Sequence, residues 1–600
     1  MVTTLFLPAT THKIMLKHDE PDYKRIFLAV ALAAVVLIGW QSKIEWPRRQ
    51  ALAKLHAQTV EQDQKAVAAS GIAQQAKPIA QDENPALSRA DRIAASPRVA
   101  IASEKLQGSI DLKGARFDDL TLLKYRETVE KDSPNVTLFS PGGDDNAYLA
   151  SIGWLASDAK TKVPDQQTLW ATDKKTLSAD DTVHLKWDNG EGVTFLLSVT
   201  LDPHYMFAVT QAVENHSGHE ITLIPYAYLN RAHEIPQKAV ILHEGPLGVM
   251  NGTLTDVTYK DLREAGTKSY EQSTGWFGIT DKYWLAAIIP ESPADKITFS
   301  HYDQHGQNRY QVDYAGAPQT VAAGSVSENK LRLFTGAKEL RLLDAYASGT
   351  IDKGSPPIAL FDRALDFGWF YFLAKPMCFI VDYLYDATGN FGVALLIFII
   401  FVKACLFPLA NKSFKSMAQM REIQPEMVKI RERYVDDQIG MHKAMRELYK
   451  TKKINPAAGC LPVLLQIIVF LSLFRGLNVT IEMRHAPFYG WIKDLSAADP
   501  SNLFTAFGLI PWTVPSWMHL GLLPMLYTVT MIVQMRTQPK PADPVQAKVM
   551  SWMPYMMLLF FDKMASGFVL YWTWSNMLSI LQQAVITRKH GPAQPAKKAA

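Results

Sequence analysis

Apolar residues are concentrated in two parts of the chain, 26–40 and the part after residue 367, with a long polar region between them. The stretch 391–410 has twenty residues and a single charge, that of Lys403. At about 1.5 Å per residue, a helix of this length crosses a hydrocarbon core of about 30 Å. The pattern therefore predicts a membrane protein with one large soluble insertion.

We predict six membrane-spanning helices. Their ranges are 26–40, 391–410, 460–477, 520–535, 549–561 and 564–587. The first follows a short basic segment and has no small-residue cleavage site directly after it, so it is interpreted as an uncleaved anchor. The spans 520–535 and 549–561 would measure about 24 and 20 Å, so they should thin the bilayer or admit water.

Basic residues give the orientation of these spans. The loop 411–457 carries eleven Lys and Arg against six Asp and Glu, which the positive-inside rule assigns to the cytoplasm. The N-terminus 1–25, the short loop 536–548 and the tail 588–600 are basic too and are expected on the same side. The loop 478–519 is poor in Lys and Arg and is expected on the outer side.

Within the loop 411–457, apolar residues recur every three or four positions on both sides of Gly440. This spacing predicts two antiparallel helices packed along an apolar seam, with a kink at Pro425 in the first. One interpretation is a docking arm for a chain arriving from the cytoplasm. The other is a stable connector, and the pattern alone does not favour either.

The polar region after the first span divides into three parts. Residues 41–107 are rich in Ala, Gln and Pro without periodicity and predict a disordered linker. From 108 to 345, short alternating runs and turn residues recur, which is typical of an all-β sandwich. Residues 360–385 combine aromatic side chains with five charges and predict an amphipathic helix at the membrane surface, interrupted at Pro376.

Composition and residue spacing argue against several classes of function. A net charge of +4 on 600 residues gives no sign of a specific nucleic-acid partner. The three cysteines lie in or beside apolar segments, and no Cys or His pair has the spacing of metal ligands. Since no Gly-rich phosphate loop is present either, we expect no cofactor, no metal and no catalytic residue.

A sugar-processing site in the β domain is conceivable from His233, His243 and Glu244, since imidazole and carboxylate could share a proton transfer. Histidine is, however, a common loop and surface residue, and no spacing singles these three out. The favoured interpretation is that they have no catalytic role.

Lys403 is the most unusual residue of the spans. A lysine within an apolar span costs about 3 kcal/mol, so it should face a partner, a wet cavity or the interface. Uncharged polar residues gather in the other spans, notably Gln466, Gln534, Thr573, Ser575, Asn576 and Ser579. Two simpler interpretations stay open: interhelical hydrogen bonds worth under about 1 kcal/mol each, and a lysine that reaches back to the membrane surface.

Several motifs follow one another in a specific order. They are FVKxxxFPL at 401–409, SMAxMxxxQP at 416–425, NPxxGCxPxxxQ at 455–466, RxAPF at 484–488, WIxDLS at 491–496 and SGxVLYxxxSN at 566–576. Together they resemble the YidC family of Gram-negative membrane protein insertases, part of the wider YidC/Oxa/Alb group. A weaker similarity covers GARxDDL at 114–120 and KYRET at 124–128.

The resemblance implies a five-helix core around a hydrophilic groove that is closed on the periplasmic side and carries one positive charge. The implied groove residues are Lys403, Gln466, Gln534, Tyr571, Thr573, Ser575, Asn576 and Ser579. The implied substrate-receiving residues of the cytoplasmic hairpin are Met417, Met420, Gln424, Pro425 and Met427. The β domain would be a periplasmic super-sandwich similar to sugar mutarotases, without catalysis.

The resemblance also implies a function and partners. The chain would insert inner-membrane proteins and act as their chaperone, alone or with the SecYEG translocon. Nascent membrane proteins, the ribosome and membrane lipids would be its other partners, and a monomer would suffice. It would lie in the cell inner membrane with both termini in the cytoplasm.

Two departures from the family pattern stand out. Lys403 occupies the position where arginine is usual; it keeps the charge but lacks the planar guanidinium. The segment 503–517 is longer and more aromatic than expected, and we interpret it as interfacial.

The alternative function is a secondary transporter with a periplasmic carbohydrate-binding domain, although inverted repeats and an intramembrane ion site are not evident. An anchored sugar epimerase is a third.

Overall fold

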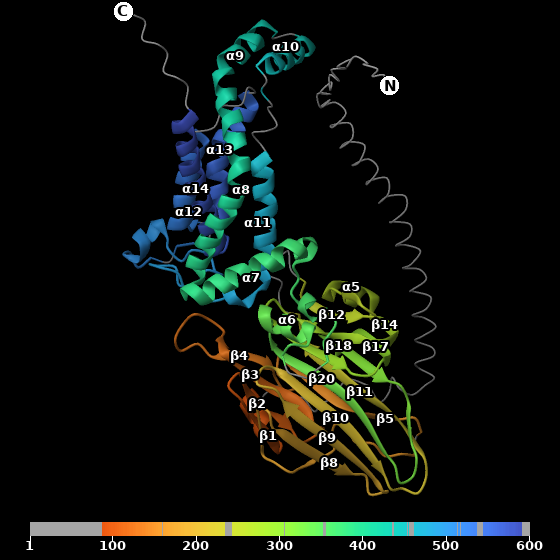
Figure 1. Cartoon of the computed structure of the whole chain (residues 1–600). Coiled ribbons are helices and arrows are strands. Elements are labelled where there is room, and N and C mark those ends of the chain that lie inside the picture. Colours follow the sequence, from red (N-terminus) through yellow and green to blue (C-terminus); the bar gives the residue numbers. More distant parts are fainter. Residues whose placement is uncertain are drawn as a thin grey trace, which may run out of the picture. The chain divides into compact units, whose positions relative to one another are not determined.

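The computed structural model describes residues 87–590, apart from 159, 235–242, 305, 352–355, 435–436, 453, 455–460, 513, 516–517 and 537–543. The predicted N-terminal segment, the predicted span 26–40, most of the predicted linker and most of the basic tail lie outside the described residues. The described part consists of a β domain followed by a helical region (Figure 1).

The β domain contains two sheets, and strands that are neighbours in each order are hydrogen-bonded. One sheet has the order β14 (Thr267–Ser273), β17 (Ala294–Gln304), β18 (Gln307–Gly316), β11 (Ile221–Ala232), β5 (Tyr148–Ala156), β3 (Arg116–Arg126), β2 (Leu106–Asp111), β1 (Arg98–Ala102), β7 (Thr176–Ser178), with β19 (Gln319–Val321) beside β11 and β4 (Asn135–Phe139) beside β3. The other has the order β13 (Thr253–Asp256), β12 (Gly245–Met250), β15 (Gly275–Thr280), β16 (Trp284–Pro290), β20 (Val326–Ala337), β10 (Met206–Asn215), β9 (Val193–Leu201), β8 (Thr182–Asp188), β6 (Ala171–Thr172). The predicted all-β sandwich is confirmed.

Alternation of apolar and polar residues explains these strands. In β9, Phe195 and Val199 are buried, whereas Ser198 and Thr200 are only partly buried. Phe195 meets Trp154 of the other sheet edge to face, with ring centroids 5.1 Å apart. One apolar core therefore joins the two sheets.

The β domain begins earlier than the sequence suggests. Helix α4 (Arg89–Ala94) is capped by Ser88, and β1 pairs with β2 along its whole length. The prediction of a disordered linker up to residue 107 is therefore wrong from residue 89 onward. The sequence pattern that marks this strand is short, because Val99 and Ile101, both buried, are its only large apolar residues.

One short helix, α5 (Tyr259–Ala265), lies within the β domain. Four helices connect the domain to the helical region: α6 (Leu340–Ser348), η2 (Phe361–Ala364), η3 (Gly368–Phe370) and α7 (Tyr371–Thr388). α7 is the predicted amphipathic helix, but it starts later and is not interrupted at Pro376. Pro376 is the sixth residue of α7. The N–H groups of the first turn of a helix have no helical acceptor, so a proline just beyond that turn removes only one backbone hydrogen bond.

Ion pairs tie α7 to the end of the β domain. Lys375 of α7 lies 2.6 Å from a carboxylate oxygen of Asp344 in α6 and 2.6 Å from one of Asp362 in η2. Arg341 of α6 lies 2.6 Å from Asp386 of α7. A partly buried cluster of charges therefore fixes α7 against α6 and η2.

Seven further α-helices make up the helical region. They are α8 (Phe391–Glu422), α9 (Gln424–Arg433), α10 (Gln438–Thr451), α11 (Leu461–Val479), α12 (Leu522–Arg536), α13 (Pro544–Phe561) and α14 (Ser566–His590), with η5 (Ile481–Met483) and η6 (Leu503–Gly508) in the loop between α11 and α12. Among the described residues, one helical segment, Phe391–Met417, is long and apolar enough to cross a membrane by itself. The count of six spans stays a prediction.

Two helices are longer than the predicted spans. α8 has 32 residues and continues without a break into the predicted hairpin. α13 has 18 residues because it begins at Pro544, and it measures about 27 Å. Its apolar part, Ala547–Phe561, is nevertheless short, and α12 has 15 residues, so the prediction of two short apolar spans is not contradicted.

The hairpin consists of the end of α8 together with α9 and α10. A bend at Ile423 separates α8 from α9, and Pro425 follows in the first turn of α9, where its missing N–H costs no helical hydrogen bond. Ile423, Met427 and Ile454 are buried together, with Met420 and Leu448 packed against them. The predicted apolar seam is confirmed at these positions.

Candidate substrate groove

The ammonium group of Lys403 on α8 is hydrogen-bonded to α14, a helix that packs directly against α8. Its Nζ donates to Oγ of Ser579 on α14 at 2.9 Å, and that Oγ in turn donates to the carbonyl of Ser575 at 2.8 Å. No carboxylate oxygen of the described residues lies within 4.0 Å of Lys403 Nζ. The charge is therefore met by one hydroxyl and remains uncompensated.

The remaining polar residues of α14 serve other contacts. Thr573 donates to the carbonyl of Val569 in its own helix at 2.7 Å. Asn576 Nδ2 donates to Oγ1 of Thr530 on α12 at 3.3 Å. Both Thr573 and Asn576 are buried, so they act as helix-packing groups, as the simpler interpretation of polar residues in spans expects.

Thr530 was missed by the sequence prediction. It lies four residues before the predicted groove residue Gln534 on α12, so the two share a helix face. That spacing was the available signal. Gln534 itself is partly buried, and the structure gives no contact between it and Lys403.

Gln466 and Tyr571 form a second pair, which joins α11 to α14. Nε2 of Gln466 donates to the hydroxyl of Tyr571, and Phe470 packs on the same ring at 5.6 Å between centroids. Of the eight predicted groove residues, the structure thus joins Lys403 with Ser579 and Ser575, and Gln466 with Tyr571.

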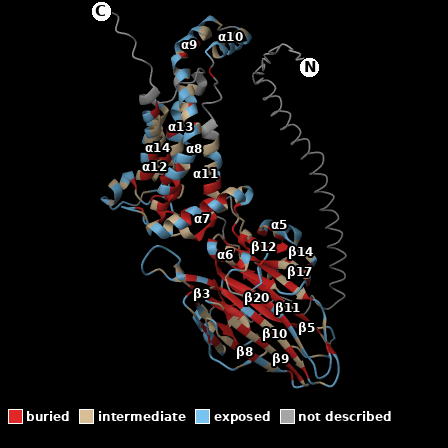
Figure 2. Cartoon of the chain, viewed as in Figure 1, coloured by how far each residue is buried: buried red, intermediate tan, exposed pale blue. Residues whose placement is uncertain are grey.

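The helices bury most of their apolar residues toward one end. The buried residues of their core all come from the ends nearest α7, as Figure 2 shows. They include Leu395 and Phe398 of α8, Leu473 and Leu477 of α11, Tyr527 of α12, Phe561 of α13 and Phe568 of α14. Tyr527 and Phe561 have ring centroids only 4.3 Å apart, which closes this end with aromatic side chains.

Toward the other end the same helices expose apolar residues. These include Phe401 and Phe407 of α8, Ile467 of α11, Val533 of α12, Trp552 of α13 and Leu581 of α14. Lys403 and Ser579 lie in this more open half. The polar contact between Lys403 and Ser579 therefore lies in the half of the bundle that buries fewer apolar residues.

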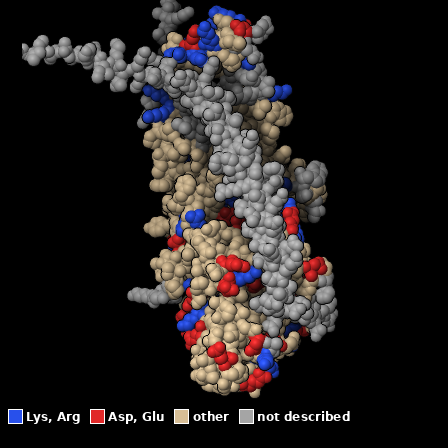
Figure 3. Space-filling view, turned by 90° about the vertical axis from the view of Figure 1, so that its right-hand side faces the viewer, with Lys and Arg blue, Asp and Glu red and all other residues tan. Residues whose placement is uncertain are grey.

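The predicted substrate-receiving residues of the hairpin are in different environments. Met427 is buried and accepts a contact from the hydroxyl of Tyr449 at 4.0 Å, and Met420 packs beside it. Pro425 is exposed, and Met417 and Gln424 are partly buried. Figure 3 shows Lys and Arg side chains gathered on the hairpin helices and few charges on the visible surface of the other helices.

The structure does not assemble a sugar-processing site from His233, His243 and Glu244. Nε2 of His243 is 3.0 Å from the carbonyl of Pro246, and burial lowers the pKa of this imidazole. Oε1 of Glu244 accepts from the backbone N–H of Lys282 at 3.2 Å, and burial raises its pKa. Since these side chains bond to backbone groups and not to one another, no acid–base pair is formed.

Comparison with known proteins agrees with this architecture. Residues 98–380 match the family model described as the YidC periplasmic domain, and residues 383–593 match the 60Kd inner membrane protein model. The chain is 41% identical over 573 residues to "Membrane protein insertase YidC" of Rickettsia conorii, covering 94% of this chain and 98% of that protein. It is 42% identical to the protein of the same name from Bradyrhizobium diazoefficiens, covering 95% and 97%.

Among solved structures, an active YidC insertase with its first transmembrane domain resolved aligns at 16% identity and a TM-score of 0.34, covering 81% of this chain and 92% of that one. A galactose mutarotase-like protein from Lactobacillus casei aligns with 40% of this chain at a TM-score of 0.28. These scores are too low to add to the assignment, which rests on the family models and on identity over nearly the whole length. The chain belongs to the YidC family of membrane protein insertases.

Proposed function

We propose that Lys403 is the point in the groove at which polar segments of nascent membrane proteins are held during insertion. The observation that carries this proposal is the lone ammonium group beside Ser579, without a carboxylate partner among the described residues, in the loosely packed half of the bundle. A charge that a structure leaves uncompensated can be compensated by a substrate. Acidic flanks of an incoming segment supply such a partner.

The proposed path needs no nucleotide or cofactor. A nascent helix arrives beside the hairpin, its polar flank moves toward Lys403, and its apolar part slides between α11 and α13 into lipid. Burial of apolar surface in the bilayer drives the last step, at about 25 cal/mol per Å². The aromatic closure at Tyr527 and Phe561 keeps the α7 end sealed meanwhile.

The chain is an inner membrane protein with a periplasmic domain. We propose in addition that it has six spans, with both termini in the cytoplasm. The basic loops 411–457 and 536–548 agree with this topology. A chain that leaves the periplasmic domain and crosses the membrane five times ends in the cytoplasm, the side on which basic loops are expected.

The partners proposed are nascent membrane proteins, the ribosome and the SecYEG translocon, with a monomer as the active unit. The support for ribosome contact is the density of Lys and Arg on α9 and α10, which suits a polyanionic surface. A secondary transporter is not favoured, because relatives along the whole chain are named insertases.

The test is photo-crosslinking to a stalled nascent single-span protein. The crosslinker is placed in turn at Lys403, Gln466 and Ser575, with Phe401 as the matched control. Phe401 lies two residues from Lys403 on α8 and is 53% exposed, so it faces a different direction. Labelling at all three groove positions, well above that at Phe401, supports the proposal. Labelling only from the hairpin, or equal labelling at Phe401, contradicts it.

A further inference from the structure

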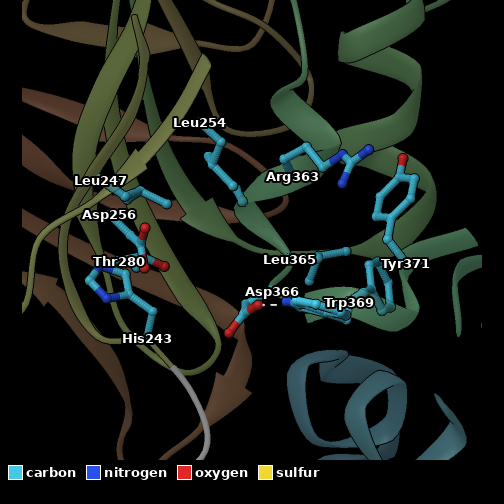
Figure 4. Close-up of a pocket in the computed structure, with 13 residues that line it drawn as sticks. His243, Leu247, Leu254, Asp256, Thr280, Arg363, Leu365, Asp366, Trp369 and Tyr371 are labelled. Atoms are coloured by element: carbon cyan, nitrogen blue, oxygen red, sulfur yellow. Dashed lines mark hydrogen bonds between the residues drawn. The ribbon is translucent and has the colours of Figure 1, made fainter. Parts of the chain in front are cut away.

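A cavity of about 380 Å³ lies between the β domain and the segment that enters α7. His243, Leu247 and Asp256 line it from the β12–β13 side, and Arg363 and Asp366 line it from the connecting segment (Figure 4). The cavity is distinct from the groove around Lys403. Nothing in the proposed insertion path uses it.

The basic end of this cavity is formed by Arg363. Its guanidinium carbon lies 3.4 Å from the centre of the Tyr371 ring, so the planar group is stacked on the phenol. No carboxylate oxygen of the described residues lies within 4.0 Å of its nitrogens. A guanidinium stacked on a ring can still use its N–H edge to bind a phosphate in two parallel hydrogen bonds.

The acidic end is formed by Asp256 and Asp366. Asp366 accepts from the backbone N–H of Gly368 at 3.0 Å, the dashed contact in Figure 4, and lies 3.4 Å from Arg475. Asp256 is exposed on β13 and makes no ion pair with any of the described residues. Two carboxylates near one another suit an ammonium group that can donate to both.

The rim of the cavity carries an exposed indole. Trp369 is 97% exposed, and Phe372, three residues further on, is 74% exposed without lining the cavity. α7 ends only two residues before α8, the helix long enough to cross a membrane. Exposed Trp at such a position marks the headgroup level of a bilayer, so the cavity opens where lipid headgroups are.

We propose that this cavity binds the headgroup of a phospholipid that carries a primary amine. The phosphodiester meets Arg363, the ammonium group meets Asp256 and Asp366, and the glycerol end runs past Trp369 toward the bilayer. A basic group and two acids at one cavity match a zwitterion. A quaternary amine could not donate hydrogen bonds to the carboxylates, and an anionic headgroup without an amine would place no donor beside Asp256, which has no ion-pair partner among the described residues.

The test uses the full chain in phosphatidylcholine vesicles with a trace of photoactivatable phosphatidylethanolamine. We expect labelled peptides from 245–256 and 363–371. Unlabelled phosphatidylethanolamine should abolish the labelling, whereas phosphatidylglycerol and further phosphatidylcholine should not. Equal competition by all three lipids, or labelling confined to other peptides, overturns the proposal. Competition by soluble phosphoethanolamine at the same concentration as the lipid assigns the site to a free ligand and also overturns it.

Matched variants separate this site from general contact with the bilayer. Arg363→Gln should reduce labelling about tenfold, the effect of losing one charged hydrogen-bonded contact. Lys260→Gln, which removes an exposed positive charge of α5, should leave it unchanged. Trp369→Ala should reduce labelling and Phe372→Ala should not. Should Arg363→Gln fail to accumulate, the competition series on the unaltered chain still decides the matter.

Discussion

Two positively charged side chains, Arg231 of the β domain and Lys403 of the helical region, differ in the partners that the fold gives them. In the β domain, Arg231 donates to Asp281 at 2.6 Å and lies over the ring of Tyr148. Arg116 likewise lies 2.5 Å from Asp111. In the helical region, the hydroxyl of Ser579 is the one partner that the described residues give Lys403. A charge with a permanent partner holds a fold together, whereas a charge without one is available to a partner that arrives and leaves.

Removing one member of a pair in the β domain gives the largest expected effect. Asp281→Ala leaves Arg231 buried without its carboxylate and should destabilise the domain by about 3 to 5 kcal/mol. Urea unfolding of the full chain in detergent, followed by tryptophan fluorescence, measures the change. Lys174→Met, which breaks the exposed pair with Asp181, should cost under about 1 kcal/mol. Equal costs would contradict the distinction between the two kinds of pair.

The second effect concerns the unpaired charge. Lys403→Ala should lower the insertion of a small single-span protein into vesicles about tenfold, while Lys403→Arg retains activity because the charge is kept. Neither should lower the unfolding midpoint of the β domain, since no ion pair is lost. The same insertion yield for all three chains would rule out an electrostatic role, and Phe401→Ala controls for a change in side-chain size on α8.

The contrast also explains what the sequence could predict. Alternation along β9 and the apolar run of α8 are local patterns, so the β-sandwich and the main span were predicted correctly. The start of the domain was missed, because Val99 and Ile101 become a strand only by pairing with β2. Local patterns show which residues are apolar, but partners distant in sequence decide where an element begins.

The groove shows the same limit. Lys403 stood out as a lone charge in a span, yet nothing local indicated that Ser579, 176 residues later, would be its hydrogen-bond acceptor. Thr573 and Asn576 were groove residues implied by the family resemblance, and their hydrogen bonds are those of helix packing. Which polar residues face the groove depends on helix rotation, which spacing alone does not give.

A smaller effect is expected where the two regions meet. Glu482 of η5 accepts from the N–H of Leu340, the first residue of α6, at 2.9 Å, and burial raises its pKa to about 7. Glu339 and Asp382 are the nearby acids that add to this rise. A carboxyl with a raised pKa stabilises the folded state fully below its unfolded value of about 4.5, and this stability is lost as pH rises through 7.

The melting temperature of the full chain should therefore fall between about pH 5 and 8. Asp313, whose pKa burial raises to about 6, contributes in the same direction. The difference between the native chain and Glu482→Gln isolates the contribution of the junction, because the amide does not titrate. If the melting temperatures of the two chains fell by the same amount across this pH range, Glu482 would not be the titrating group.

The smallest effect is expected for the helix-packing groups of the groove. Asn576→Ala and Thr530→Ala each remove the 3.3 Å hydrogen bond between α14 and α12. Pairs of this kind in membrane helices couple by about 0.6 kcal/mol, so the double variant should be only slightly more stable than the sum of the two single changes. Thermal unfolding in detergent measures this coupling, and insertion should stay near the native level. A loss of insertion as large as that of Lys403→Ala would mean that Asn576 faces the substrate and that the groove is wider than its one charged contact.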